Sequence, residues 1–94
     1  MKFTCPCCGI KSMSNENRGT IETCEICFWH NDFVQFQDPN RLYGANDVSL
    51  RQAQHNYMMF GASQEIYIPY VRKPSILERA TQTPFVKRIT GVQN

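Results

Sequence analysis

The sequence predicts one small α+β domain, residues 1–94, that needs more than apolar packing to fold. Its 94 residues, 41% hydrophobic and 19% charged, are enough for a single domain with a modest core. All five cysteines lie in the first third of the chain, and an apolar pattern of helical period follows later. We therefore expect the cysteines to supplement the core.

The spacing of the cysteines favours a metal site. Cys5 and Cys8, like Cys24 and Cys27, form a C-x2-C pair, and fifteen residues separate the two pairs. Two such pairs placed face to face supply the four thiolates of a closed tetrahedral site. The pattern predicts one structural Zn²⁺ held by these four cysteines. An odd cysteine count, in a chain that opens without an apolar signal segment, argues against a secreted disulfide framework.

Other interpretations of the cysteines stay open. Iron in a rubredoxin-like site is the nearest competitor, weakened because Phe28 rather than glycine follows the second pair. A thioredoxin-like redox motif would use the first pair and leave the second unexplained. Cys7 could replace a ligand or recruit a second metal or partner, but a small residue in the turn is the favoured interpretation. His30 is close enough in sequence to be a ligand, yet with four cysteines available we expect an ordinary strand or loop side chain.

The segment 18–36 reads as a strand, the second cysteine pair and another strand. Thr20, Ile21 and Thr23 favour extended structure before the pair, and the aromatic and β-branched residues of 33–36 favour a strand after it. Asp38 and the following proline end this strand. The prediction is a short hairpin around the metal.

An amphipathic helix follows the hairpin. Ser49 is the expected N-cap, Gln52 its capping-box partner, and Gly61 the expected stop. The apolar residues recur at steps of three, four and three, which places them on one face. We expect this face to pack against the hairpin, with the last two members buried. Its members are Leu50, Ala53, Tyr57 and Phe60.

The rest of the chain gives weaker signals. Residues 66–68 could form a short strand that Pro69 stops, and residues 74–80 could start a helix with Pro74 or Ser75 at its beginning. We expect an extended C-terminal segment over residues 64–94. No apolar run is long enough to span a membrane.

Several motifs, in order, resemble the bacterial cysteine-rich CPCC family, from about Phe3 to about Ser63. The resemblance implies a small zinc ribbon, with the ribbon cysteines at the four positions already named, and a core over 1–63 followed by an extension over 64–94. One departure is His30–Asn31, where the family usually has acidic residues. The matching residues are Cys5-Pro6-Cys7-Cys8-Gly9, Arg18-Gly19, Cys24, Cys27-Phe28-Trp29, Asn46, Val48-Ser49-Leu50, Ala53, Asn56-Tyr57 and Phe60-Gly61-Ala62.

The charges bear on the class of function. The formal net charge is +2, and four thiolates with one zinc ion add −2, so the loaded chain is near neutral and poorly suited to a polyanion. Residues 1–47 hold four basic and six acidic side chains, and residues 48–94 hold six and two. The loaded halves are therefore near −4 and +4. His30 and His55 belong to no nucleophile motif, so we expect no enzyme.

We expect a cytoplasmic protein-interaction module that binds an acidic protein. An inhibitor or immunity-type protein that neutralises a toxin or nuclease fits this size and charge distribution. The alternative is a nucleic-acid-binding ribbon that uses the same basic and aromatic surface, to which Phe85 would then add. No role at a membrane is expected. The predicted partner-binding residues are Tyr67, Tyr70, Arg72, Lys73, Lys87 and Arg88.

Overall fold

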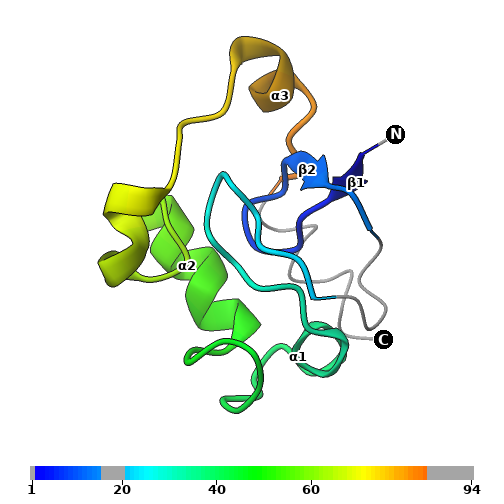
Figure 1. Cartoon of the computed structure of the whole chain (residues 1–94), viewed down its shortest axis with the longest axis vertical. Coiled ribbons are helices and arrows are strands. Elements are labelled where there is room, and N and C mark those ends of the chain that lie inside the picture. The colour runs from blue at the N-terminus through cyan, green and yellow to red at the C-terminus, as the bar shows by residue number, and fades with distance from the viewer. Residues whose placement is uncertain (1, 16–20, 85–94) are drawn as a thin grey trace.

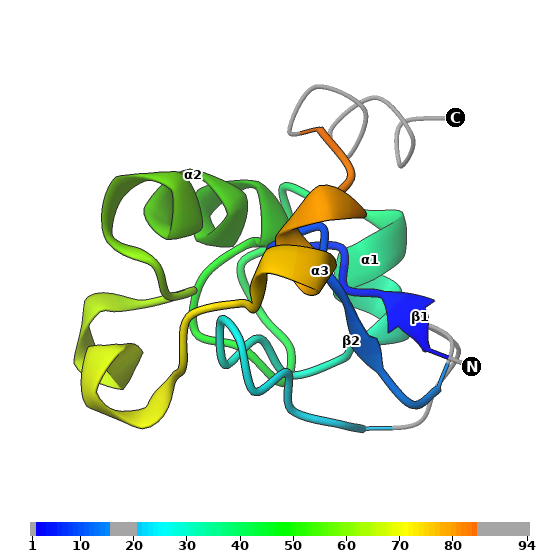
Figure 2. The same ribbon diagram turned by 90° about the horizontal axis from the view of Figure 1, so that it is seen from above.

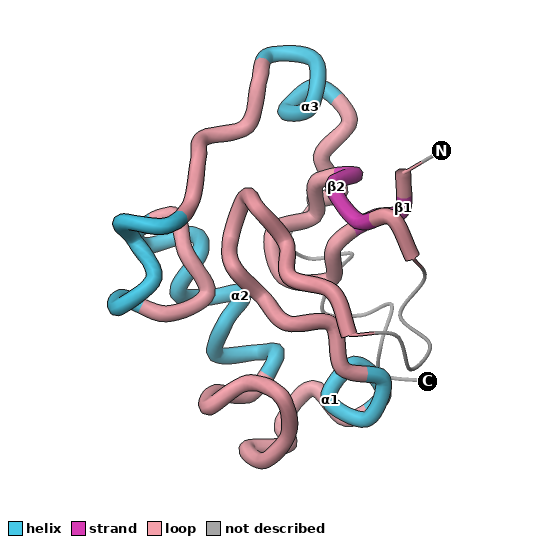
Figure 3. The backbone as a smooth tube through the Cα atoms, in the orientation of Figure 1, coloured by secondary structure: helices cyan, strands magenta, loops and turns pink. Residues whose placement is uncertain are grey.

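The computed structural model describes residues 2–15 and 21–84, which form a small α+β fold around the cysteines (Figure 1). Loops make up most of the backbone, and the helices are short (Figure 3). The α+β class is thereby confirmed. In chain order the elements are β1 (Phe3–Thr4), β2 (Lys11–Met13), α1 (Phe33–Gln37), α2 (Leu50–Phe60), the 3-10 helix η1 (Glu65–Tyr70) and α3 (Ile76–Ala80).

Each cysteine pair lies in a loop closed by antiparallel pairing. Strands β1 and β2 form a two-stranded hairpin, in which Phe3 lies opposite Met13, and the loop between them holds the first pair. A single bridge between Thr23 and His30 closes the loop that holds the second pair. The predicted hairpin over 18–36 is thus reduced to one bridge, and its first residues, 18–20, lie outside the described part of the chain.

The strand predicted at 33–36 is wrong, because this segment forms helix α1. The Asp32 side chain caps the helix by accepting a hydrogen bond from the Gln35 backbone N–H at 3.0 Å. The Gln35 side chain is buried and donates to the carbonyl of Val48 at 3.1 Å, whereas Phe33 and Val34 are exposed. A local cap and a buried amide therefore override the β-propensity of the aromatic and branched residues.

A buried asparagine connects the second cysteine loop to the chain that follows α1. The Asn46 side chain accepts from the His30 backbone N–H at 2.8 Å and donates to the His30 carbonyl at 2.7 Å. It also donates to Gln35 Oε1 at 2.9 Å. Because Asn46 is 2% exposed, these bonds satisfy polar groups that water does not reach.

The predicted boundaries of α2 are confirmed. Ser49 accepts from the Gln52 backbone N–H at 3.1 Å, and Gly61 ends the helix with a left-handed φ of +82°. Leu50 and Ala53 are fully buried. The burial predicted for Phe60 is wrong, since its side chain is 37% exposed. Helix α2 is longer than the small core beside it, so the side chains of its last turn extend beyond the residues that could bury them.

Tyr57 has an intermediate place on the same helix. It is half-buried and packs against the edge of the core. Burial raises the pKa of its hydroxyl to about 12. The prediction of an inner position for Tyr57 is therefore met in part.

The segment after α2 forms helical turns where a strand was predicted at 66–68. Among the described residues no strand lies beside it, and the Tyr67 backbone N–H bonds instead to the Gln64 carbonyl at 3.0 Å, with Pro69 inside η1. The predicted helix at 74–80 is confirmed as α3, with a capping box between Ser75 and Glu78. In the described part of the chain no helix is long and apolar enough to cross a membrane.

The core is built around the cysteines. Among the described residues, the buried apolar cluster has eleven members, of which five are cysteines. Trp29, Ile10 and Met13 are its largest members. With so few aliphatic side chains, apolar burial alone provides a small share of the stabilisation that a domain of this size needs.

Replacing the buried asparagine tests how far its hydrogen bonds hold the second cysteine loop in place. We expect Asn46→Ala to lower the free energy of unfolding by about 3 kcal/mol, because the variant leaves the two His30 backbone groups without a partner. Urea unfolding of the metal-loaded protein measures the change.

The matched control is Asn40→Ala. Asn40 is exposed and accepts one bond from Arg51 Nε at 3.0 Å, so this change should cost less than about 0.5 kcal/mol. Equal losses in the two variants would show that the buried network adds nothing specific.

Candidate metal centre

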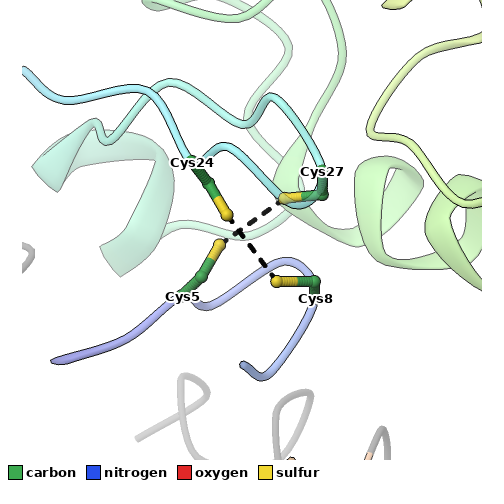
Figure 4. Close-up of side chains that lie close together, drawn as sticks. All are labelled: Cys5, Cys8, Cys24 and Cys27. Carbon is green, nitrogen blue, oxygen red and sulfur yellow. Dashed lines mark hydrogen bonds between the residues drawn. The ribbon is translucent and has the colours of Figure 1, made fainter. Parts of the chain in front are cut away.

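The four sulfurs of the two cysteine pairs converge on one point (Figure 4). The Cys5 and Cys27 sulfurs are 3.6 Å apart, the Cys8 and Cys24 sulfurs are 3.8 Å apart, and all four lie within 4.8 Å of one another. A tetrahedral ion with metal–sulfur bonds of about 2.3 Å separates its ligands by about 3.8 Å. The spacing therefore fits a single tetrahedrally bound metal ion.

The two loops present their sulfurs through the same backbone arrangement. In the first loop the Gly9 N–H donates to the Cys5 carbonyl at 2.8 Å, and in the second the Phe28 N–H donates to the Cys24 carbonyl at 2.7 Å. Gly9 has a φ of +77° and Phe28 a φ of +68°. The two loops are thus near repeats, and each turn needs a left-handed residue directly after its second cysteine.

Phe28 takes this conformation without being a glycine. A left-handed φ costs a residue with a side chain about 1 kcal/mol. Contacts between rings offset the cost, because the ring of Tyr67 lies 4.5 Å from that of Phe28 and the rings of His30 and Tyr70 lie within 6 Å. Since Phe28 adopts the backbone conformation of glycine, its presence gives no reason to prefer zinc over iron.

Burial and mutual hydrogen bonding shift the pKa values of the four thiols. Burial raises the pKa of Cys5 and Cys27 well above the usual thiol range. Hydrogen bonding to Cys24 raises the pKa of Cys8, and hydrogen bonds from the other thiols, that of Cys27 first, lower the pKa of Cys24. Burial and crowding therefore disfavour several thiolates at once when no cation is bound. Four thiolates can coexist here only around a positive ion.

Ser12 adds a polar contact that the sequence did not reveal. Its hydroxyl lies 2.9 Å from the Cys24 sulfur, and this contact helps to lower the pKa of the Cys24 thiol. Such contacts orient a ligand and stabilise its charged form. The only sign of this contact in the sequence is a hydroxyl residue four positions after Cys8, and such a spacing alone does not predict a hydrogen bond to a cysteine.

Two residues considered as ligands lie outside the group of four. Cys7 is fully buried beside Cys27. The His30 ring is engaged elsewhere, because its Nδ1 lies 2.8 Å from the hydroxyl of Thr23. The group of four consists of the predicted ligands alone.

The second half of the chain binds to the backbone of both cysteine loops. At the second loop the Ser63 N–H donates to the Cys27 carbonyl at 2.7 Å. At the first loop the Gln54 side chain donates to the Pro6 carbonyl at 2.9 Å, and the Gln82 side chain donates to the Cys8 carbonyl at 2.8 Å. Residues far apart in sequence thus enclose the centre on several sides.

The residues predicted to bind a partner have different surroundings. Tyr70 is exposed, whereas Tyr67 is half-buried against Phe28. The exposed Arg72 is bound to two carboxylates of its own chain, with its Nε 2.8 Å from Glu25 and its Nη2 2.8 Å from Glu78. This contact with Arg72 holds the pKa of Glu78 at about 2. Lys73 is exposed. Lys87 and Arg88 lie outside the described residues.

A comparison of two neighbouring cysteines tests the assignment of ligands. We expect Cys8→Ser to lose the bound metal, because it removes one of the four converging sulfurs. Elemental analysis of the purified variant, which reports zinc and iron separately, measures the content per chain.

The control is Cys7→Ser, at a buried thiol outside the group of four. It should keep one metal ion per chain, since every converging sulfur remains in place. The assignment is overturned if Cys7→Ser loses the metal while Cys8→Ser keeps it.

A comparison with models of protein families finds a match. The model of the family described as Cysteine-rich CPCC matches residues 3–78. The match passes Ser63, the expected end of the resemblance, and runs through η1 into α3. No curated protein and no solved structure matches the chain significantly. Because the matched segment includes both cysteine loops and most of the chain, the protein belongs to the cysteine-rich CPCC family.

Proposed function

We propose that the four cysteines hold one structural Zn²⁺ and that the folded chain is a protein-interaction module. The spacing of the sulfurs and their complete burial support a closed site. Four cysteine ligands leave no position for water or substrate, so the metal would act on folding and not on catalysis. On this basis the protein is proposed to have no enzymatic activity.

The observation that carries the interaction role is a set of exposed apolar side chains on α2, η1 and α3. Small proteins rarely leave so many large apolar side chains in water on three successive elements, and large apolar surfaces mark interaction sites. Hydrogen bonds to the two cysteine loops hold the segments that carry these side chains. The side chains are Met58, Met59, Phe60, Ile66, Ile68, Tyr70, Ile76 and Leu77.

The charge distribution supports an acidic protein partner. The half of the chain that holds α2, η1 and α3 has six basic and two acidic side chains. We propose that the module works by covering its partner, as an inhibitor or immunity-type protein covers a toxin or nuclease. Five free, buried thiols are consistent with a reducing compartment, and the cytoplasm is the proposed location.

A nucleic-acid partner has less support among the described residues. Arg72 shares its charge with Glu25 and Glu78, so it is less available to a phosphate. The exposed apolar residues on α2, η1 and α3 include two aromatic rings, those of Phe60 and Tyr70, among aliphatic and thioether side chains. The described residues therefore offer few free cations for counterion release and few aromatic rings for base stacking.

Two binding measurements test this function together. The metal-loaded protein, titrated with a labelled single strand and a labelled duplex at moderate salt, should show no salt-sensitive binding. Affinity purification from the source cells should recover one protein in stoichiometric amounts, and the two purified proteins should form a complex again. Salt-sensitive binding to either nucleic acid, with no protein that reassembles, would replace the proposed function by the alternative.

A further inference from the structure

A groove with a volume of about 600 Å³ lies between the last turn of α2, η1 and the segment that leads into α3. Figures 1 and 2 show this segment as an open strap between η1 and α3. The apolar walls are formed by Met58, Met59 and Phe60 from α2 and by Ile68 from η1. Met58 and Met59 are 61% and 68% exposed. These methionines therefore contribute little to the core that the helix covers with its other face.

The composition of the groove walls suits a helical partner. Methionine side chains are flexible and polarisable, and they adapt to varied apolar shapes. The groove is lined by residues of the helices and of the loops beside them, and no residue of β1 or β2 contributes to it. A strand would need an exposed sheet edge for its backbone bonds, but an amphipathic helix needs only an apolar groove for its anchor residues.

The charge of the lining selects an acidic partner. Three basic residues and no acidic residue line the groove within the described part of the chain. Arg72 is already bound to two carboxylates. Lys73 and Arg79 form no ion pair among the described residues, so their charges are available to a ligand.

Two occupants from the same chain fit less well. The C-terminal residues 85–94 contain Lys87 and Arg88 and no acidic side chain, so the lining would repel them. A second copy that paired groove to groove would bring two basic linings, each with Lys73 and Arg79, against each other. Neither arrangement neutralises the basic lining.

We propose that this groove binds an acidic amphipathic helix of the partner protein, an inference that rests on the proposed interaction function. The apolar face of the partner helix packs against Met58, Met59 and Phe60. Its acidic flank pairs with Lys73 and Arg79. The partner helix thereby covers the apolar surface that the short chain leaves exposed.

A designed peptide probes the groove directly. The probe is a labelled peptide of about 14 residues, with leucine at i, i+3, i+4 and i+7 and glutamate at most other positions, long enough to form a helix on binding. Fluorescence anisotropy measures its affinity for the metal-loaded protein. We expect it to bind about 10-fold or more tightly than the same peptide with lysine in place of glutamate. Equal affinity for both peptides, or no binding of the acidic one, overturns the inference.

Matched variants show whether the binding site is this groove. Met59→Glu and Lys73→Glu should each weaken binding of the acidic peptide about 10-fold, because they place a negative charge in or beside the groove. The controls are Leu42→Glu and Lys11→Glu, which make the same changes at exposed positions outside the groove lining. They should stay within about twofold of the native affinity. All variants are compared at equal metal content and helical circular dichroism, and equal effects in both pairs contradict the inference.

The same variants separate this inference from the function on which it rests. If a stoichiometric partner binds the native chain and all four variants equally, the interaction function stands and the groove is not its site. If no partner reassembles with the native chain, the proposed function itself fails. If Met59→Glu and Lys73→Glu lose the partner while the two control variants keep it, the result supports both the interaction function and the groove as its site.

Discussion

The structure depends on four buried sulfurs that share a volume too small for four negative charges. Their mutual distances fit one tetrahedral cation, and burial together with crowding disfavours several thiolates in its absence. The loops that carry them are otherwise closed by a two-stranded hairpin and a single bridge. Backbone pairing this limited is marginal without a further constraint. A metal ion bound by the four sulfurs would supply that constraint and would occupy the place that a larger domain gives to aliphatic side chains.

The cysteine loops also organise the part of the chain that has no cysteine. Gln54 from α2 and Gln82 after α3 donate to carbonyls of the first loop, and the Ser63 N–H donates to a carbonyl of the second. Arg72 connects Glu25, inside the second loop, to Glu78 in α3. The elements around the groove are therefore tied to the cysteine loops, so metal binding by these loops would be coupled to the shape of the groove.

The sequence predicted the features that local chemistry determines. Cysteine spacing identified the four converging sulfurs, and the hydroxyls of Ser49 and Ser75 marked the starts of α2 and α3. It failed where distant groups decide the local conformation. Residues 33–37 form helix α1 and not a strand because the Gln35 side-chain amide donates a hydrogen bond to a backbone carbonyl in a later loop. The position of η1 depends on the contact between the rings of Tyr67 and Phe28. Phe60 is exposed because the core is too small to reach it, which no helical period reveals.

The central claim is that the metal ion acts as the core of the fold. The most direct test removes the metal with a chelator under reducing conditions and follows circular dichroism and hydrodynamic radius, then restores one equivalent of Zn²⁺. The account predicts that the chain expands and loses its native spectrum without metal, and regains both when zinc returns. A metal-free, reduced chain that keeps the native spectrum and radius would contradict it.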